Sequence, residues 1–186
     1  WAARLGPAAS GPGAVQAVAR DATLVGRDED QTRLQSTLAR HRLVTLVGLG
    51  GVGKTRLARA VADAAPTALW LPLLDVFSVS EVPHRVQRAL GLPPTPQRDP
   101  AARAGELLAQ RGVGLLVLDN AEHLLSPDGA ICRLLSGWLA IAPALRLLVT
   151  SREPLGDAAE VVLPLRALAL PAPGSQDLAA PAVQLL

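Results

Sequence analysis

Short apolar runs alternate with amphipathic stretches along this chain. The runs are rich in leucine and valine, as strands buried on both faces are, and lie at 43–47, 68–71, 113–119, 145–149 and 160–163. The amphipathic stretches have apolar residues at helical spacing and lie at 28–40, 54–62, 83–90, 100–112 and 131–139. Strands that alternate with helices predict an α/β domain of three layers around a central parallel sheet.

Two helix starts carry capping signals. Asp28, with Gln31 three residues further on, is expected to be the N-cap of the first helix. Asp99 followed by Pro100 combines a capping carboxylate with a proline in the first turn, so a helix is expected to begin there.

The octapeptide at 48–55 lies between the first apolar run and the helix that follows it, and reads G-x-x-x-x-G-K-T, the spacing of a nucleotide phosphate loop. Its glycines let backbone N–H groups approach phosphate oxygens, and the helix that begins near Lys54 adds its positive end. Lys54 is the only lysine of the chain and suits the β- and γ-phosphates, while Thr55 offers a hydroxyl to Mg²⁺. A glycine-rich turn with a purely structural role explains the glycines, but neither the lone lysine nor Thr55.

Asp119 ends the third apolar run. A carboxylate at the end of a second buried strand is what such a site uses to hold magnesium, directly or through water. The next residue is Asn120, at a position where vigorous ATPases often carry the carboxylate that activates the attacking water, so slow hydrolysis is expected. Glu122 is open to two interpretations, a substitute for that carboxylate or a solvated residue at a helix start.

Thr150 and Arg152 follow the fourth apolar run. Ligands of open α/β sheets bind beyond the carboxyl ends of the strands, so both residues are expected at the same edge as the loop and Asp119. An arginine there can contact a terminal phosphate and report its presence. The alternative is a surface arginine at the start of a loop.

Composition narrows the class of protein. The chain has 186 residues, of which 49% are apolar and 18% charged, and its formal net charge is only +2. No apolar run reaches the ~18 residues of a membrane span, so a cytoplasmic protein without membrane contact is expected. With one phenylalanine, three tryptophans and no tyrosine, a base-stacking surface for single-stranded nucleic acid is not expected. A single cysteine excludes an internal disulfide.

Four ordered motifs resemble those of the NB-ARC-type ATPase domain of bacterial STAND regulators, in particular actinobacterial transcriptional regulators of the antibiotic-regulatory and large LuxR types. The motifs lie at 24–27, 48–55, 116–125 and 148–155, and the resemblance covers about residues 22–186. It implies a P-loop NTPase fold of the additional-strand, AAA-like type, in which the strand before Arg152 lies between the phosphate-loop strand and the Asp119 strand. It also implies a nucleotide-dependent switch, in which ADP holds a closed monomer and ATP favours an open, self-assembling form.

The resemblance assigns the site residues. It places Val25, Gly26 and Arg27 beside the adenine and ribose, and it makes Arg152 the sensor of the γ-phosphate. The predicted nucleotide-binding residues are Val25, Gly26, Arg27, Gly48, Gly50, Gly51, Val52, Gly53, Lys54, Thr55, Arg56 and Arg152. The predicted catalytic residues are Lys54, Asp119 and Arg152, and the predicted metal ligands are Thr55 and Asp119.

Three segments are expected along the chain. Residues 1–21 are expected to be a linker and the end of a preceding domain, 22–170 the P-loop nucleotide-binding domain, and 171–186 a linker and the start of a helical subdomain. The chain begins with Trp1 and contains no methionine, so it is expected to be part of a longer protein. The segment Gly-Leu-Pro-Leu and the winged helix that close over the nucleotide in the similar family are not found in it, so weaker binding and incomplete switching are expected.

Three functions are compatible with these residues. The favoured one is a switch that binds ATP or ADP with Mg²⁺, hydrolyses ATP slowly and controls a larger transcriptional regulator. A stand-alone P-loop kinase or ATPase is the alternative, although 75–100 shows no acceptor site beside its arginines. A scaffold that binds no nucleotide is disfavoured by the intact Lys54, Thr55 and Asp119. The expected partners are an adenine nucleotide, other domains of the same chain and further copies of it, without direct DNA contact from this part.

Overall fold

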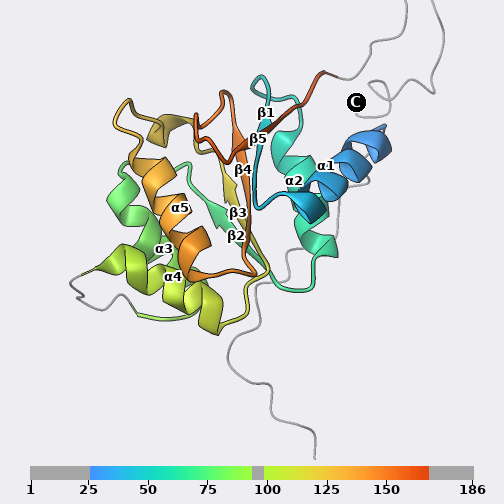
Figure 1. Cartoon of the computed structure of the whole chain (residues 1–186). Helices are drawn as coiled ribbons and strands as arrows, with labels where there is room; N and C mark the ends of the chain where they lie inside the picture. The colour runs from blue at the N-terminus through green and yellow to red at the C-terminus, as the bar shows by residue number, and fades with distance from the viewer. Residues whose placement is uncertain (1–25, 94–98, 168–186) are drawn as a thin grey trace, which may run out of the picture.

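The computed structural model describes residues 26–93 and 99–167, whose strands form one sheet with helices on both faces (Figure 1). The elements in chain order are α1 (Asp28–Arg40), β1 (Leu43–Val47), α2 (Lys54–Ala64), β2 (Ala68–Pro72), α3 (Val82–Ala89), α4 (Pro100–Gln110), β3 (Leu115–Asp119), α5 (Ala130–Ile141), β4 (Arg146–Ser151) and β5 (Val161–Pro164). Two short 3₁₀ helices are η1 (Val79–Glu81) and η2 (Glu122–Leu124). Every strand and helix expected between residues 28 and 163 is present, with ends shifted by two residues at most.

The sheet is parallel throughout, and its strand order is β2-β3-β4-β1-β5. Strand β4 therefore lies between the phosphate-loop strand β1 and the strand β3 that ends in Asp119, which confirms the inserted strand and the P-loop fold class. Because the strands run in one direction, the carboxyl ends of β1, β3 and β4 meet at one edge. The last residue of β1, Val47, is paired with Ser151 at the end of β4.

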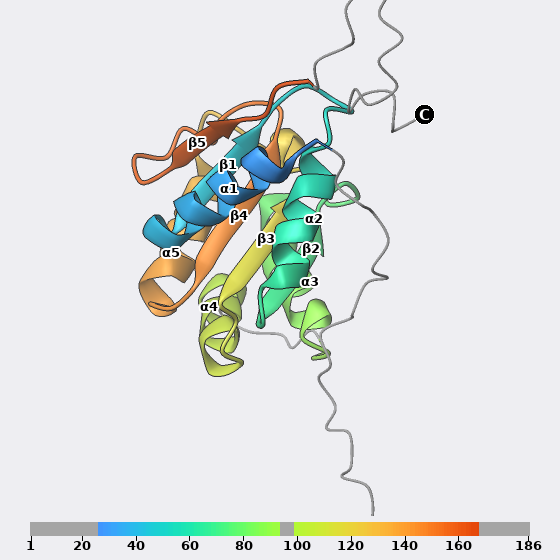
Figure 2. The same cartoon turned by 90° about the vertical axis from the view of Figure 1, so that its right-hand side faces the viewer.

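Two separate apolar cores cover the two faces of the sheet. Helices α3, α4 and α5 pack on one face, and α1 and α2 pack on the other, which is the face turned toward the viewer in Figure 2. Alternate side chains of β3 belong to different cores: Leu116 faces α3–α5, and Val117 faces α1 and α2. Both are fully buried, so the continuous apolar sequence of β3 follows from its place inside the sheet.

One of the two expected helix caps is wrong. Asp99 does cap α4, because its Oδ1 accepts a hydrogen bond from the Ala102 backbone at 3.0 Å. Asp28, however, is the first residue of α1; Arg27 takes the N-cap position and makes no side-chain cap bond. The acidic residues of the first turn still lie at the positive end of the helix dipole. The Arg27 side chain instead donates to Asp30 in the first turn of α1 and to the backbone carbonyls of Val52 and Arg166.

Several sequence expectations fall outside the described residues. These are the segments 1–21 and 171–186 of the expected domain division, its boundary stretches 22–25 and 168–170, and with them Val25. Among the residues that are described, no helix combines the length and the apolar character needed to cross a membrane.

Candidate functional site

The loop between β1 and α2 is shaped by three of its glycines for two different reasons. Gly51 and Gly53 have φ angles of 76° and 98°, in the left-handed region where a side chain is strained. At Gly48 a Cβ atom would lie 2.7 Å from the carbonyl oxygen of Leu165, because the chain that leaves β5 runs against the loop. The Gly48 N–H also donates to the carbonyl of Ser151 at 3.3 Å. The loop is therefore held between the end of β4 and the chain after β5.

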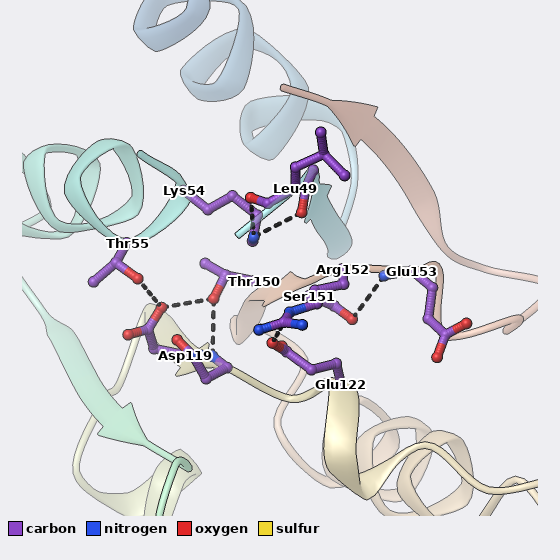
Figure 3. A network of polar contacts seen from close by, with 11 residues as sticks. Leu49, Lys54, Thr55, Asp119, Glu122, Thr150, Ser151, Arg152 and Glu153 are labelled. Atoms are coloured by element: carbon purple, nitrogen blue, oxygen red, sulfur yellow. Dashed lines mark hydrogen bonds and ion pairs between the residues drawn. The ribbon is translucent and has the colours of Figure 1, made fainter. Parts of the chain in front are cut away.

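The Lys54 side chain turns back over this loop (Figure 3). Its Nζ donates to the carbonyl oxygens of Gly48, at 2.7 Å, and Leu49, at 3.0 Å. Helix α2 begins at Lys54, and no described side chain caps it, so the N–H groups of its first turn are available to an anion. An anionic ligand in the loop would meet both the ammonium group and the positive end of α2.

At the edge of the sheet, the Asp119 carboxylate is in contact with both α2 and β4. The carboxylate is only 8% exposed, and its Oδ1 accepts hydrogen bonds from the Thr55 hydroxyl at 2.9 Å and the Thr150 hydroxyl at 2.6 Å. Thr150 Oγ1 in turn accepts the Asn120 N–H at 2.9 Å. Neither hydroxyl bond uses Asp119 Oδ2. The two predicted metal ligands, Thr55 and Asp119, are thus in direct contact.

The donor atoms at this edge fit magnesium better than a transition metal. Thr55 and Asp119 offer a hydroxyl and a carboxylate, which are oxygen donors only. Within 26–93 and 99–167, no group of three or more His, Cys, Asp or Glu side chains is placed to hold a metal ion. Magnesium needs no such group, since it keeps several waters and commonly binds one or two carboxylates together with phosphate oxygens.

Arg152 lies beside the phosphate loop, at the edge where the sequence placed it. Its Nε forms an ion pair with Glu122 Oε1 at 3.1 Å, and a Cβ atom on Gly50 would lie 3.7 Å from its Nη2. The guanidinium group therefore sits between η2 and the loop (Figure 3). The Arg152 side chain is 68% exposed, so a ligand in the loop can reach it.

The turn after β3 depends on Asn120. This is the only described residue other than glycine with a positive φ, at 65°. Asparagine is several-fold enriched in that region, because its side chain tolerates it better than most. The turn brings Glu122 to the start of η2, where 18% of its side chain is exposed. Glu122 does lie at a helix start, but it is paired with Arg152 and mostly buried rather than solvated.

Arg27 connects three segments beside the loop. Only 7% of the residue is exposed. Its Nη1 donates to Asp30 Oδ2 at 2.7 Å and to the Arg166 carbonyl at 2.8 Å, and its Nη2 donates to the Val52 carbonyl at 2.9 Å. The guanidinium group thus ties α1, the phosphate loop and the chain after β5 together. A pocket of about 500 Å³ opens here, lined by Gly26, Arg27, Asp30, Arg33, Pro164, Arg166 and Ala167.

The structure thus gathers most of the predicted residues around one edge of the sheet. Arg56 is exposed on α2 and takes no part in the contacts described above. Thr150 was expected at this edge, and Glu122 was considered as a substitute for the missing carboxylate. Neither was among the predicted site residues, although each contacts one that was. A polar residue at the end of an apolar run was the available signal for Thr150. No sequence pattern indicated the partner of Glu122.

Comparison with known proteins gives a family and a set of longer relatives. Residues 37–152 match the model of a family described as an AAA domain. A Mycobacterium tuberculosis protein named as an HTH-type transcriptional regulator is 41% identical over 131 residues, which are 69% of this chain and 14% of that protein. An uncharacterised M. tuberculosis protein is 34% identical over 144 residues, 75% of this chain and 36% of its own length. The chain therefore spans a minor part of these curated relatives.

Solved structures with a similar fold include two archaeal proteins. Cdc6p from Pyrobaculum aerophilum superposes with a TM-score of 0.58 at 19% identity, over 80% of this chain and 48% of its own. A STAND protein with a tetratricopeptide repeat sensor, from Pyrococcus horikoshii, superposes with a TM-score of 0.56 at 19% identity, over 81% of this chain and 24% of its own. At such identities the likeness is one of fold.

Proposed function

Because the chain belongs to the AAA-domain family of P-loop nucleotide-binding domains, we propose that it is a nucleotide-dependent switch. It binds ATP or ADP with Mg²⁺, hydrolyses ATP slowly and controls the activity or self-assembly of a larger transcriptional regulator. The observation that carries the proposal is the convergence of Lys54, the Thr55–Asp119 contact and Arg152 at one edge of the sheet. The 41% identity to a protein named as a transcriptional regulator supports the regulatory part, although the chain spans 14% of that protein.

In this proposal the loop and Lys54 bind the phosphates. The ammonium group exchanges its bonds with the Gly48 and Leu49 carbonyls for bonds with the β- and γ-phosphates, which are charge-assisted and therefore stronger. The free N–H groups at the start of α2 add neutral donors to the same phosphates. Thr55 and Asp119 would hold Mg²⁺, and the ion would supply positive charge beside the phosphates.

The nucleoside end is assigned to the pocket beside Arg27. The pocket borders the phosphate loop through the bond from Arg27 to the Val52 carbonyl, so a nucleotide can extend from the loop into it. Gly26 and Arg27 contribute to its lining, and Val25 is proposed as the third contact there. The end of β5 and the chain after it contribute Pro164 and Arg166 to the same lining. Nucleotide in this pocket would therefore touch the segment that follows β5.

Slow turnover follows from the residue next to Asp119. The Asn120 amide cannot take a proton from water near neutral pH, so it offers no general base where vigorous ATPases carry one. Its backbone N–H donates a hydrogen bond to Thr150 Oγ1, and this bond holds the turn in place. A site of this kind keeps ATP bound for long enough to act as a signal.

Isothermal titration calorimetry with ATP, ADP and GTP in the presence of Mg²⁺ tests the binding part of this proposal. The adenine nucleotides are expected to bind and GTP to bind more weakly. Sedimentation velocity with each nucleotide tests the switching part, for which self-association is expected with ATP and not with ADP. The result that contradicts the proposal is failure of all three nucleotides to bind at millimolar concentration, both to this chain and to a longer one that includes the following subdomain.

A further inference from the structure

The Glu122–Arg152 pair joins a mostly buried side chain to an exposed one. Glu122 is 18% exposed, whereas Arg152 is 68% exposed, and they touch through Oε1 and Nε at 3.1 Å. An exposed arginine loses considerable rotamer freedom when one position is imposed on it, and its partner determines which position that is. Glu122 therefore determines where Arg152 points.

The backbone around Glu122 is anchored to β4, the strand that precedes Arg152. The Ala121 N–H donates to the Thr150 carbonyl at 3.0 Å, and Leu124 N–H donates to the Ala121 carbonyl at 2.9 Å. Ala121 and Leu124 are both buried, at 0% and 4% exposure. The backbone that carries Glu122 is thus attached to the same strand end as the arginine that it contacts.

The pair engages only one side of the guanidinium group. Glu122 takes Nε, and within the part of the chain that is described no hydrogen bond is made by Nη1 or Nη2 of Arg152. Nη2 is the atom that a Cβ on Gly50 would approach to 3.7 Å, so this end of the guanidinium group lies toward the phosphate loop. The two terminal amino groups form the fork that binds phosphate oxygens in pairs.

Glu122 also retains an unsatisfied atom. Its Oε2 is buried and has no hydrogen-bond partner among the described residues. A buried acceptor without a donor is costly, and a side chain kept in such a place calls for an explanation beyond stability. The contact with Arg152 provides this explanation, because a Glu122 carboxylate that turned outward into water would lose its ion pair with the arginine.

We propose that Glu122 is a positioning residue that sets the preference of this site for a nucleoside triphosphate over a diphosphate. It holds Arg152 through Nε and leaves the terminal amino groups facing the place of a γ-phosphate beside Gly50. A diphosphate does not reach that place and gains nothing from the arrangement. The inference rests on the proposed function, since it takes the phosphate loop to be a nucleotide site.

The contrary possibility is that Glu122 withholds Arg152 from the phosphate. The two arrangements predict opposite signs for the same change. If Glu122 withheld the arginine, its removal would free the guanidinium group and remove a negative charge, and ATP would bind more tightly. If Glu122 positions the arginine, its removal lets the side chain move and ATP binds more weakly. The contact through Nε alone favours positioning, because it leaves the phosphate-binding fork open.

Glu122→Ala and Glu122→Gln separate these cases in calorimetric titrations with Mg²⁺ and either ADP or a non-hydrolysable ATP analogue. Glu122→Ala is expected to weaken the analogue about three- to tenfold, the size expected for ordering one long side chain, and to leave ADP unchanged. Glu122→Gln keeps an oxygen acceptor for Nε and is expected to recover most of the loss. Glu153→Ala is the matched control, since it removes a neighbouring exposed carboxylate and is expected to change neither affinity.

A double-mutant cycle with Arg152→Ala shows whether Glu122 acts through the arginine. In the Arg152→Ala background, Glu122→Ala is expected to cause no further loss of ATP-analogue affinity. Unchanged or increased analogue affinity in both Glu122 variants would overturn the inference and leave the proposed function standing. A wild-type chain that binds neither nucleotide would overturn both. ADP affinity and thermal unfolding report whether each variant is folded. If Glu122→Ala is not folded, Glu122→Leu carries the test, because it keeps the bulk of the side chain but removes the oxygen acceptor, and the same loss of analogue affinity is expected.

Discussion

Thr55 and Asp119 are 64 positions apart in the sequence, yet Thr55 Oγ1 and Asp119 Oδ1 are joined by a hydrogen bond of 2.9 Å. The contact connects the first turn of α2 to the end of β3 across the strand that separates β3 from β1. Because Thr150 of β4 donates to the same oxygen, the carboxylate is held both from α2 and from the neighbouring strand β4. The proposed metal site is therefore set before any ion arrives.

Asp119→Asn tests the assignment of this carboxylate to magnesium. An asparagine carbonyl oxygen can still accept the bonds from Thr55 and Thr150, so the fold is expected to survive. The negative charge is lost, so the increase in ATP affinity that Mg²⁺ gives to the wild-type chain is expected to disappear. ATP titrations in the presence of Mg²⁺ and in the presence of EDTA measure this increase in affinity. The exposed Asp63 on α2 provides a control, and an Mg²⁺ effect that persists in Asp119→Asn would rule out this role.

Arg152→Ala tests the discrimination between ATP and ADP. A charge-assisted hydrogen bond that forms only with a γ-phosphate contributes about 1.5–3 kcal/mol, or roughly ten- to a hundredfold in affinity. The variant is expected to weaken ATP by that factor and to leave ADP almost unchanged. In the full-length protein, the same change should hold the regulator inactive, because ATP no longer favours the open state. Equal losses for ATP and ADP would identify Arg152 as structural.

The rate of hydrolysis tests the interpretation of Asn120. The wild-type chain should turn over ATP well below the ~10 s⁻¹ that is typical of enzymes. A purified chain that releases phosphate at several per second without a partner would contradict this. Asn120→Asp is the informative variant, because aspartate, like asparagine, is enriched at positive φ, and Asn120 has a φ of 65°. If water activation limits the rate, the added carboxylate should raise it.

The same backbone angle predicts how stability responds at this position. Asn120→Gly is expected to leave the free energy of unfolding almost unchanged, since glycine adopts positive φ without strain. Asn120→Ala is expected to lower it by about 1–2 kcal/mol, the cost of a left-handed conformation for a residue with an ordinary Cβ. Denaturant unfolding curves measure both. Equal stability of the two variants would show that the turn relaxes when its side chain is changed.

Arg27→Ala should destabilise the domain and weaken nucleotide binding together. The side chain is buried and donates to Asp30 and to the carbonyls of Val52 and Arg166, which the variant leaves without this donor. A buried group that loses its partner costs about 1–3 kcal/mol. Lysine cannot make the same set of bonds from one planar group, so Arg27→Lys should be only a partial rescue. A variant that loses nucleotide affinity at unchanged stability would instead place Arg27 in contact with the ligand alone.

The sequence predicted the sheet well because buried parallel strands have a continuous apolar pattern that polar loops interrupt. It also placed Thr150, Asp119 and Arg152 at one edge, since the carboxyl ends of parallel strands coincide. The start of α1 was predicted wrongly, because the N-cap position is taken by Arg27, whose bonds reach Arg166, 139 residues away. A capping motif describes neighbours along the chain and carries no information about such contacts.

The partner of Arg152 was beyond prediction for a related reason. Glu122 reaches it only because the chain turns at Asn120 with a positive φ, and neither the angle nor the direction of the turn follows from residue pattern. The contact of Thr55 with Asp119 was foreseen as a shared role in metal binding. Its geometry depends on the position of β4 between β1 and β3. That strand order was expected from the resemblance to the STAND family and not from the apolar pattern.

Binding of Mg²⁺-ATP to the wild-type chain and to Lys54→Ala is the most direct test of the proposed switch, because every further step requires nucleotide in this loop. The wild type is expected to bind with saturable heat in a calorimeter, and Lys54→Ala to bind at least about tenfold more weakly, as loss of a charge-assisted bond requires. The control is Arg40→Ala, which changes an exposed residue at the C-terminal end of α1 and should bind Mg²⁺-ATP as the wild type does. Equal affinity of the wild type and Lys54→Ala for Mg²⁺-ATP would contradict the account.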